Sequence, residues 1–292
     1  MGRKLLKALG ILLAVAVGFA LALVAVSLWR ADEGLPIGER IGVVELQGFI
    51  ADAGPTVEAL RDFQDDEGIR AVVLRVESPG GVVAPAQEIH DAVRRVAEAK
   101  PVVASMGAVA ASGGYYVSAP CTRIVANPGT ATGSIGVILQ FQQVHLLFDK
   151  LGLRTQVVKS GPFKDAGSPF REMTDPERRV FQDLIDDLFD QFVDAVVRGR
   201  HLDREAVLAL ADGRVYSGRQ AQELGLVDEL GGFWDAVALA QQLGGLEGKP
   251  RLEYRRRRTG GLVRWLLGEE ARDWVRWESA GAPPLRYVVP NW

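Results

Sequence analysis

Residues 71–76 (AVVLRV), followed after Glu77 by Ser78-Pro79-Gly80-Gly81, decide how this chain folds. A short apolar run rich in β-branched residues predicts a buried strand, and the proline and glycines end it. Apolar residues at helical spacing then extend over residues 85–99. A strand, a glycine-rich loop and a helix in this order predict one unit of a parallel sheet that is covered by helices.

The same alternation continues on both sides of this unit. We expect further strands at residues 41–50, 101–105, 124–126, 134–139, 155–159 and 226–228. We expect helices at residues 56–64, from about residue 112, at 144–151, 203–211 and 217–224, and from residue 233. Thr174 and Glu177 form a capping-box pattern, which predicts a long helix that runs to about Arg198. The chain is therefore expected to be an α/β protein with mostly parallel sheets and covering helices.

The N-terminus predicts one transmembrane helix. Residues 8–29 are 22 residues without a charge, and as a helix at ~1.5 Å per residue they reach roughly 33 Å, enough to cross a bilayer. Arg3, Lys4 and Lys7 precede them, so the positive-inside rule keeps the N-terminus in the cytoplasm. The remainder then lies on the extracytoplasmic side of the cell membrane. A cleaved signal peptide is the alternative, although its apolar region usually spans only ~7–15 residues.

Three parts follow from this division. Residues 1–33 form the cytoplasmic N-terminus and anchor, residues 34–249 the main domain, and residues 250–292 a basic, Trp-rich tail. Within the tail, residues 262–277 predict either an amphipathic helix on anionic lipid or a helix that packs on protein. We hypothesise that residues 282–292 dock in an apolar groove.

The formal net charge of -3 is unevenly distributed. Residues 1–30 and 251–292 each carry an excess of four positive charges, which leaves the middle of the chain strongly acidic. An acidic body argues against nucleic acid as a partner, and basic ends fit contact with membrane lipid. The single cysteine, Cys121, excludes an intrachain disulfide, and we expect it in the core. We expect no metal or other cofactor, because the three histidines lack the spacing of metal ligands.

Two glycine-rich loops contain residue types that could take part in catalysis. In the first, the N–H groups of Gly80 and Gly81 follow a buried strand and could approach a substrate closely, as an oxyanion hole requires. A tight turn explains the same glycines. In the second, AVAASGGYY (residues 108–116), Ser112 is expected to have an accessible hydroxyl and an amide that faces an oxyanion. An N-cap serine is the alternative there.

A third loop, KSGPFKDAGSP (residues 159–169), contains Lys164. The chain uses 27 Arg but only 7 Lys. A desolvated lysine can act as a base, whereas an arginine cannot be deprotonated in a protein. Simple exposure on the surface is the alternative for any single lysine.

Together these motifs resemble the signal peptide peptidase A family of membrane serine proteases. The resemblance runs from about residue 41 to residue 243, in the same order and at similar spacing, and includes TGSIGV (132–137) and DGRVYSG (212–218). One departure is Glu77, where the family usually has Asn, and this change could alter the polarity of the pocket.

The resemblance implies a role for each candidate residue. Ser112 would be the nucleophile and Lys164 the general base of a Ser–Lys dyad, and Ser134 would orient the lysine amine. Backbone N–H groups of Gly80 or Gly81 and of Gly113 would hold the oxyanion. The reaction would transfer the acyl group of a peptide to the serine and then to water.

The resemblance also implies a crotonase-like, Clp-protease-like fold and a ring-like or dome-like homo-oligomer on the membrane. The expected substrates are signal peptides already released by signal peptidase, and other apolar membrane segments. Ser112 and Lys164 need not belong to the same subunit. Two other interpretations stay open: an acyl-CoA enzyme of the crotonase fold, and a non-catalytic scaffold that binds peptides. A Ser–His–Asp arrangement is disfavoured because the first histidine after Ser112 is His145.

Overall fold

The computed structural model describes residues 17–18, 39–255 and 286–288. Met1–Glu39 and Arg40–Trp292 are separate compact units, and the α/β fold belongs to the second. Apart from Val17 and Gly18, which are helical, the predicted anchor at residues 8–29 lies outside the described residues, and so does the predicted tail helix at 262–277. Within the described ranges, no helix is both long enough and apolar enough to cross a membrane.

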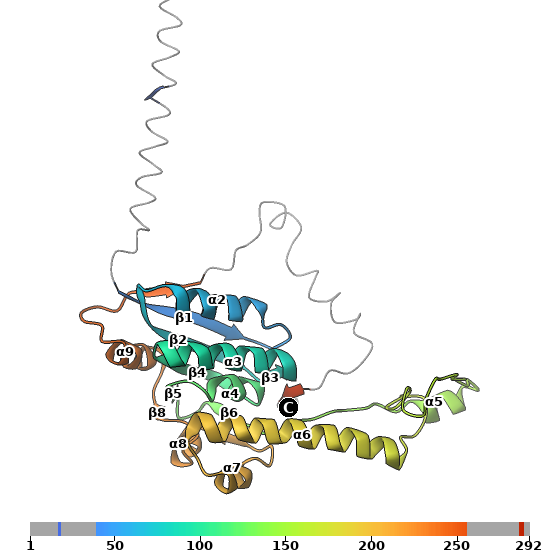
Figure 1. Ribbon diagram of the computed structural model, residues 1–292. Coiled ribbons are helices and arrows are strands. Elements are labelled where there is room, and N and C mark those ends of the chain that lie inside the picture. The colour runs from blue at the N-terminus through green and yellow to red at the C-terminus, as the bar shows by residue number, and fades with distance from the viewer. Residues whose placement is uncertain (1–16, 19–38, 256–285, 289–292) are drawn as a thin grey trace, which may run out of the picture. The chain divides into compact units, whose positions relative to one another are not determined.

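A mostly parallel sheet forms the centre of the second unit (Figure 1). Its strands are β1 (Arg40–Gln47), β2 (Ile69–Ser78), β4 (Val102–Ala111), β5 (Arg123–Ala126), β6 (Ala131–Gly133), β7 (Val215–Ser217), β8 (Glu229–Leu230) and β9 (Leu252–Tyr254). They lie in the order β7-β6-β4-β2-β1-β9, while β5 pairs with β4 and β8. The β6–β7 pair is antiparallel, and the other pairs in this sheet are parallel. A separate antiparallel pair joins β3 (Gly80–Val82) to β10 (Arg286–Val288).

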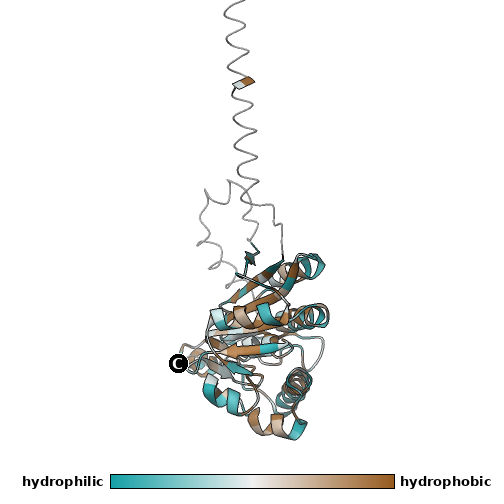
Figure 2. Cartoon of the chain, turned by 90° about the vertical axis from the view of Figure 1, so that its left-hand side faces the viewer, coloured by the Kyte–Doolittle hydropathy of each residue, from teal (hydrophilic) through white to brown (hydrophobic). Residues whose placement is uncertain are grey.

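Helices cover both faces of the sheet. The helices in the described part of this unit are α2 (Gly54–Asp65), α3 (Val83–Ala99), α4 (Gly113–Ser118), α5 (His145–Lys150), α6 (Asp175–Arg200), α7 (Arg204–Leu210), α8 (Gly218–Glu223) and α9 (Phe233–Leu243). On one face α2, α3 and α4 pack on the sheet, and on the other α9 contributes the buried residues Ala236, Val237 and Ala240. In Figure 2 the strands are largely brown, whereas the helices carry teal residues on their outer sides. Strands covered on both sides explain why residues 71–74 of β2 are buried without interruption.

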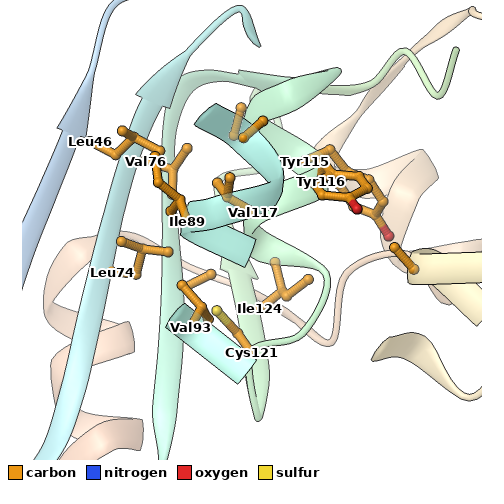
Figure 3. Close-up of a cluster of buried hydrophobic side chains, with 14 of the residues drawn as sticks. Leu46, Leu74, Val76, Ile89, Val93, Tyr115, Tyr116, Val117, Cys121 and Ile124 are labelled. Atoms are coloured by element: carbon orange, nitrogen blue, oxygen red, sulfur yellow. The ribbon is translucent and has the colours of Figure 1, made fainter. Parts of the chain in front are cut away.

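The larger core lies between the sheet and α3 and α4, as Figure 3 shows. Ile89 and Val93 of α3 and Val117 of α4 meet Leu74 of β2 there. Cys121 lies in the same cluster and is 2% exposed. Burial raises the pKa of its thiol to about 12. The prediction that Cys121 is a core residue is confirmed, since a neutral, buried thiol is a poor nucleophile.

Most of the predicted elements form, with ends that differ by a few residues. The capping box is confirmed: the Thr174 side chain accepts the Glu177 N–H, and the Glu177 carboxylate accepts the Thr174 N–H, at the start of α6. Sequence patterns did not predict the short strands β3, β6, β7, β9 and β10.

Three strand predictions were wrong. Residues 134–139 form no strand, because β6 finds its partners β4 and β7 earlier and ends at Gly133. Residues 155–159 form none either, and Val157 and Val158 are exposed there rather than buried in a sheet. The strand expected at 226–228 begins only at Glu229, where β8 pairs with β5.

Residues 140–173, which we call the arm, connect β6 to α6 and include α5. Figure 1 shows the arm projecting away from the sheet and from α4. Its side chains are unusually apolar for an exposed segment. The exposed large hydrophobic residues of the arm are Leu146, Leu147, Leu151, Leu153, Val157, Val158, Phe163 and Phe170. So much exposed apolar surface on one segment is uncommon in a soluble domain.

Candidate active site

Ser112 occupies the junction between β4 and α4. Its backbone has φ 52° and ψ −116°, and a positive φ is uncommon for a residue other than glycine. Ser112 is 1% exposed, and its Oγ has no hydrogen-bond partner within the described part of the chain. A buried hydroxyl without a partner and a strained backbone both cost free energy. Their coincidence at one residue makes Ser112 the centre of the candidate site.

Two expectations for Ser112 are wrong. Its hydroxyl is buried in this structure, so it is not accessible as expected. The Ser112 N–H does not face an oxyanion site, because it donates to the Gly133 carbonyl at 2.8 Å. Helix capping does not explain the residue either. Ser112 is the N-cap of α4, yet its side chain makes no capping hydrogen bond.

Ser134 lies immediately beyond this contact. Its φ is 51°, it is 4% exposed, and its N–H donates to the Arg214 carbonyl at 2.9 Å. Gly133 must be glycine, because its φ is 77° and a Cβ there would lie 2.6 Å from the ring of Tyr216. Since Gly133 accepts the Ser112 N–H, the backbones of the two predicted serines lie side by side.

The Ser78–Gly81 loop packs directly on α4 and on Ile50, which lies three residues beyond the end of β1. A Cβ at Gly81 would lie 2.2 Å from the Ile50 carbonyl oxygen, and a Cβ at Gly114 would lie 2.7 Å from the Ser78 carbonyl oxygen. The Gly80 N–H donates to the Ser78 Oγ at 3.1 Å. Close packing therefore explains these glycines in part, and the Gly80 amide is already engaged.

The other two predicted oxyanion donors have different surroundings. Gly113 is buried and begins α4 directly after Ser112. Gly81 lies in β3, opposite Tyr287 of β10.

The edge of β3 carries a segment from the C-terminal tail. Arg286, Tyr287 and Val288 pair antiparallel with Val82, Gly81 and Gly80. Part of the tail therefore lies against the loop that holds the oxyanion candidates. In this structure β10 occupies that edge of β3. That residues 282–292 dock in a substrate groove stays a hypothesis.

Lys164 is not brought to Ser112. It lies on the arm, its side chain is exposed, and its N–H donates to the Gly161 carbonyl at 3.2 Å. Because the Ser112 Oγ has no partner among the described residues, the predicted Ser–Lys contact does not form within this chain. The sequence left open whether the two groups belong to one subunit.

An ion-pair network fixes the loop beside Lys164. Asp165 binds both Lys159 and Arg171, and Arg171 also binds Glu177 at the start of α6. The Arg171 guanidinium and the Lys159 ammonium hold the pKa of the Asp165 carboxyl well below its usual range. Arg171, with the Thr174 amide, lowers the pKa of Glu177 to about 2. Lys164 is thus the residue of this loop whose amine stays outside the network.

Sequence reasoning missed the residues that support β4 just before Ser112. The Glu77 carboxylate accepts two backbone N–H groups of β4. The hydroxyls of Thr130 and Thr132 each donate to a β4 carbonyl at 2.7 Å. The only signal in the sequence was the unusual Glu77 before the glycine loop, and its contacts depend on a pairing between distant segments.

Comparisons with known proteins agree with this site. A model of peptidase family S49 matches residues 94–247, which include Ser112, Ser134 and Lys164. A protein of Synechocystis sp. that is provisionally named a protease is 43% identical over 211 residues, covering 72% of this chain and 76% of the relative. A protein of Enterococcus faecium, provisionally named signal peptide peptidase SppA, is 35% identical over 250 residues, covering 81% of this chain and 72% of the relative.

A more distant relative is found in a plant. The chloroplastic serine protease SPPA of Arabidopsis thaliana is 31% identical over 202 residues, covering 69% of this chain and 30% of the relative. The family match spans more than half of the chain, and the bacterial relatives are covered over most of their length. The chain therefore belongs to peptidase family S49.

Proposed function

We propose that the chain is a membrane-bound serine endopeptidase in which Ser112 is the nucleophile and Lys164 the general base. One observation carries this proposal: the Ser112 hydroxyl is buried without a partner at a strained strand–helix junction, next to a glycine loop. The names of the relatives support a proteolytic reaction, and the chloroplastic relative is named a serine protease.

The lysine of each site would come from a second copy of the chain. Ser112 is held inside the domain, whereas Lys164 lies exposed on the arm. Docking of the arm on a second copy would cover exposed residues such as Leu147 and Leu151 and bring Lys164 to that copy's Ser112. Burial against apolar surface also favours the neutral form of a lysine, which a base requires. A closed homo-oligomer would complete every site in this way.

In the proposed reaction the Ser112 Oγ attacks the peptide carbonyl carbon while the lysine amine takes the Oγ proton. The carbonyl oxygen becomes an anion and accepts N–H bonds from Gly81 and Gly113. The C–N bond then breaks, the leaving amine receives the proton from the lysine, and an ester remains on Ser112. Water then loses a proton to the lysine and attacks the ester carbonyl carbon. The C–Oγ bond breaks, the Ser112 Oγ takes that proton from the lysine, and the peptide leaves as a carboxylic acid. The Ser134 hydroxyl would orient the amine.

An extended peptide would bind by taking the place of β10 as the strand beside β3. The antiparallel pairing of β10 with β3 supports this mode, because it shows that the edge accepts a chain segment beside Gly81. Apolar peptides, above all signal peptides already released from their proteins, are the proposed substrates. The apolar residues 8–29 and the basic tail support attachment to a membrane, with the catalytic domain on the extracytoplasmic side.

Complementation between two inactive variants tests the proposal. Ser112→Ala and Lys164→Ala should each lower the hydrolysis of a synthetic signal peptide by at least about 10⁴-fold. Co-expressed as mixed oligomers, they should recover about a quarter of the wild-type rate, because some sites combine an intact serine with an intact lysine from the neighbouring copy. Lys150→Ala, another lysine of the arm, is the matched control and should stay active.

Other outcomes separate the alternatives. No recovery in mixed oligomers would place both groups in one subunit. Full activity of Lys164→Ala would mean that another group is the base. A wild-type protein that binds the peptide but never cleaves it would favour the non-catalytic scaffold, and hydrolysis of acyl-CoA alone would favour the acyl-CoA enzyme.

A further inference from the structure

The strand that leads to Ser112 contains an irregularity. β2 and β4 pair in parallel from Val72 opposite Val102 to Val76 opposite Met106, and the next pair joins Ser78 to Ala110. Between these pairs β2 advances by two residues and β4 by four. β4 therefore carries a bulge immediately before the nucleophile. Bulges of this kind redirect a strand, and they are frequent beside active sites.

Glu77 binds backbone N–H groups of β4 at residues that the bulge leaves without a partner in β2. Its Oε2 accepts the Ala108 N–H at 2.9 Å, and its Oε1 accepts the Val109 N–H at 3.1 Å. Hydrogen bonds to a charged acceptor are about twice as strong as neutral ones. A Cβ at Gly107 would lie 1.6 Å from the Glu77 Oε2, so only glycine at that position leaves room for the carboxylate.

The other edge of the bulge is held by two buried threonines. The Thr130 Oγ donates to the Gly107 carbonyl, and the Thr132 Oγ donates to the Ala110 carbonyl, both at 2.7 Å. Backbone groups on both sides of the bulge thus have side-chain partners. Ser112 follows two residues after Ala110, in a conformation that persists only if its surroundings impose it.

We infer that Glu77 is a positioning residue for Ser112: its carboxylate fixes the β4 bulge and thereby the place and direction of the nucleophile. Glu77 itself does not touch the reacting atoms in this role. The inference rests on the proposed function for its effect on catalysis, but the contact between Glu77 and the bulge is independent of any activity.

Kinetics of Glu77 variants test the effect on catalysis. Glu77→Ala removes both acceptors, and because a misplacement of about 1 Å can cost about 100-fold in rate, we expect kcat to fall by that order. KM should stay within about twofold, because substrate binding is not affected. Glu77→Gln keeps one carboxamide oxygen as an acceptor and should restore most of the loss. Glu58→Ala removes an exposed carboxylate from α2 and serves as the control for lost charge.

Hydrogen exchange provides the readout that does not need activity. In Glu77→Ala, peptides that cover residues 106–111 should exchange their amide protons faster than in the wild type, with Glu77→Gln between the two. Unchanged kcat together with unchanged exchange in Glu77→Ala would overturn the inference. A change in KM alone would overturn it too, since it would make Glu77 a substrate contact. A wild-type protein without peptidase activity would remove the proposed function, whereas faster exchange in Glu77→Ala would still support the bulge contact.

Discussion

The candidate catalytic residues of the β4–α4 junction and of the arm differ in how far they are buried and in how firmly their surroundings hold them. At the junction, Ser112 is buried, and its backbone is held by β6 and by the partners of the β4 bulge. On the arm, Lys164 is exposed among apolar side chains that the described chain leaves uncovered. In the proposed mechanism, the chain therefore positions the nucleophile Ser112 by itself, whereas a second copy would have to complete the site with Lys164.

The largest effect is expected from substitutions on the surface of the arm, which test whether the arm docks on a second copy. Replacing Leu146, Leu147 and Leu151 by Ser removes exposed apolar surface without touching Ser112 or Lys164. If the arm docks on a second copy, the oligomer should dissociate and peptidase activity should fall by about 100-fold or more, because Lys164 is no longer positioned. Sedimentation and kinetics on the same samples measure both effects.

The control for this prediction is the stability of the domain itself. Surface substitutions away from the core change the free energy of unfolding by about 0.5 kcal/mol or less. Oligomers of wild-type size with wild-type activity would contradict the docking of the arm.

A smaller loss of stability and activity is expected when a methyl group is added to the glycine loop that packs on the β4–α4 junction. Gly81→Ala places a Cβ 2.2 Å from the Ile50 carbonyl oxygen, so the loop must shift. Overpacking of this kind costs about 1–3 kcal/mol, and activity should fall because the Gly81 amide moves. Gly161→Ala on the arm is the matched control, since nothing lies within 4 Å of its Cβ.

Denaturant unfolding and kinetics of the two alanine variants give the result. Equal behaviour of the two variants would show that the junction is not the tightly held region described above.

The smallest expected effect is a weakening of the ion-pair network of the arm at low pH. In the folded protein the pKa values of Asp165 and Glu177 lie below their ordinary values because of Arg171. Carboxyls with lowered pKa values stabilise the fold above their unfolded pKa of about 4, and this contribution is lost as pH falls towards the folded values. The arm should therefore become more sensitive to proteolysis below about pH 4.

Arg171→Ala distinguishes this network from a general effect of acid. Without the guanidinium, the arm should be cleaved readily already at pH 7, with less further change on acidification. Limited proteolysis at several pH values, with the cut sites identified by mass spectrometry, measures it. If cuts in the arm were equally slow in both proteins at pH 7, the network would have no role in holding the loop.

The site was only partly predictable from sequence. Ser112 stood out because a serine between small residues followed an apolar strand, and the structure gives it an unusual backbone. Its amide was assigned wrongly, because the hydrogen bond to Gly133 joins two segments that only the sheet brings together. The support from Glu77 could not be predicted, since it depends on a two-residue shift in the pairing of β2 and β4.

Local sequence patterns were enough to predict the alternation of strands and helices, the capped start of α6 and the burial of Cys121. These properties depend on the spacing of apolar residues and on the residue types at a cap, and a short stretch of sequence contains both kinds of information. Only the tertiary structure decided that residues 134–139 and 155–159 form no strands, because a strand exists only where another strand offers hydrogen bonds. It also decided that Ser112 and Lys164 lie apart in one chain, because the distance between two loops depends on how the whole sheet is assembled.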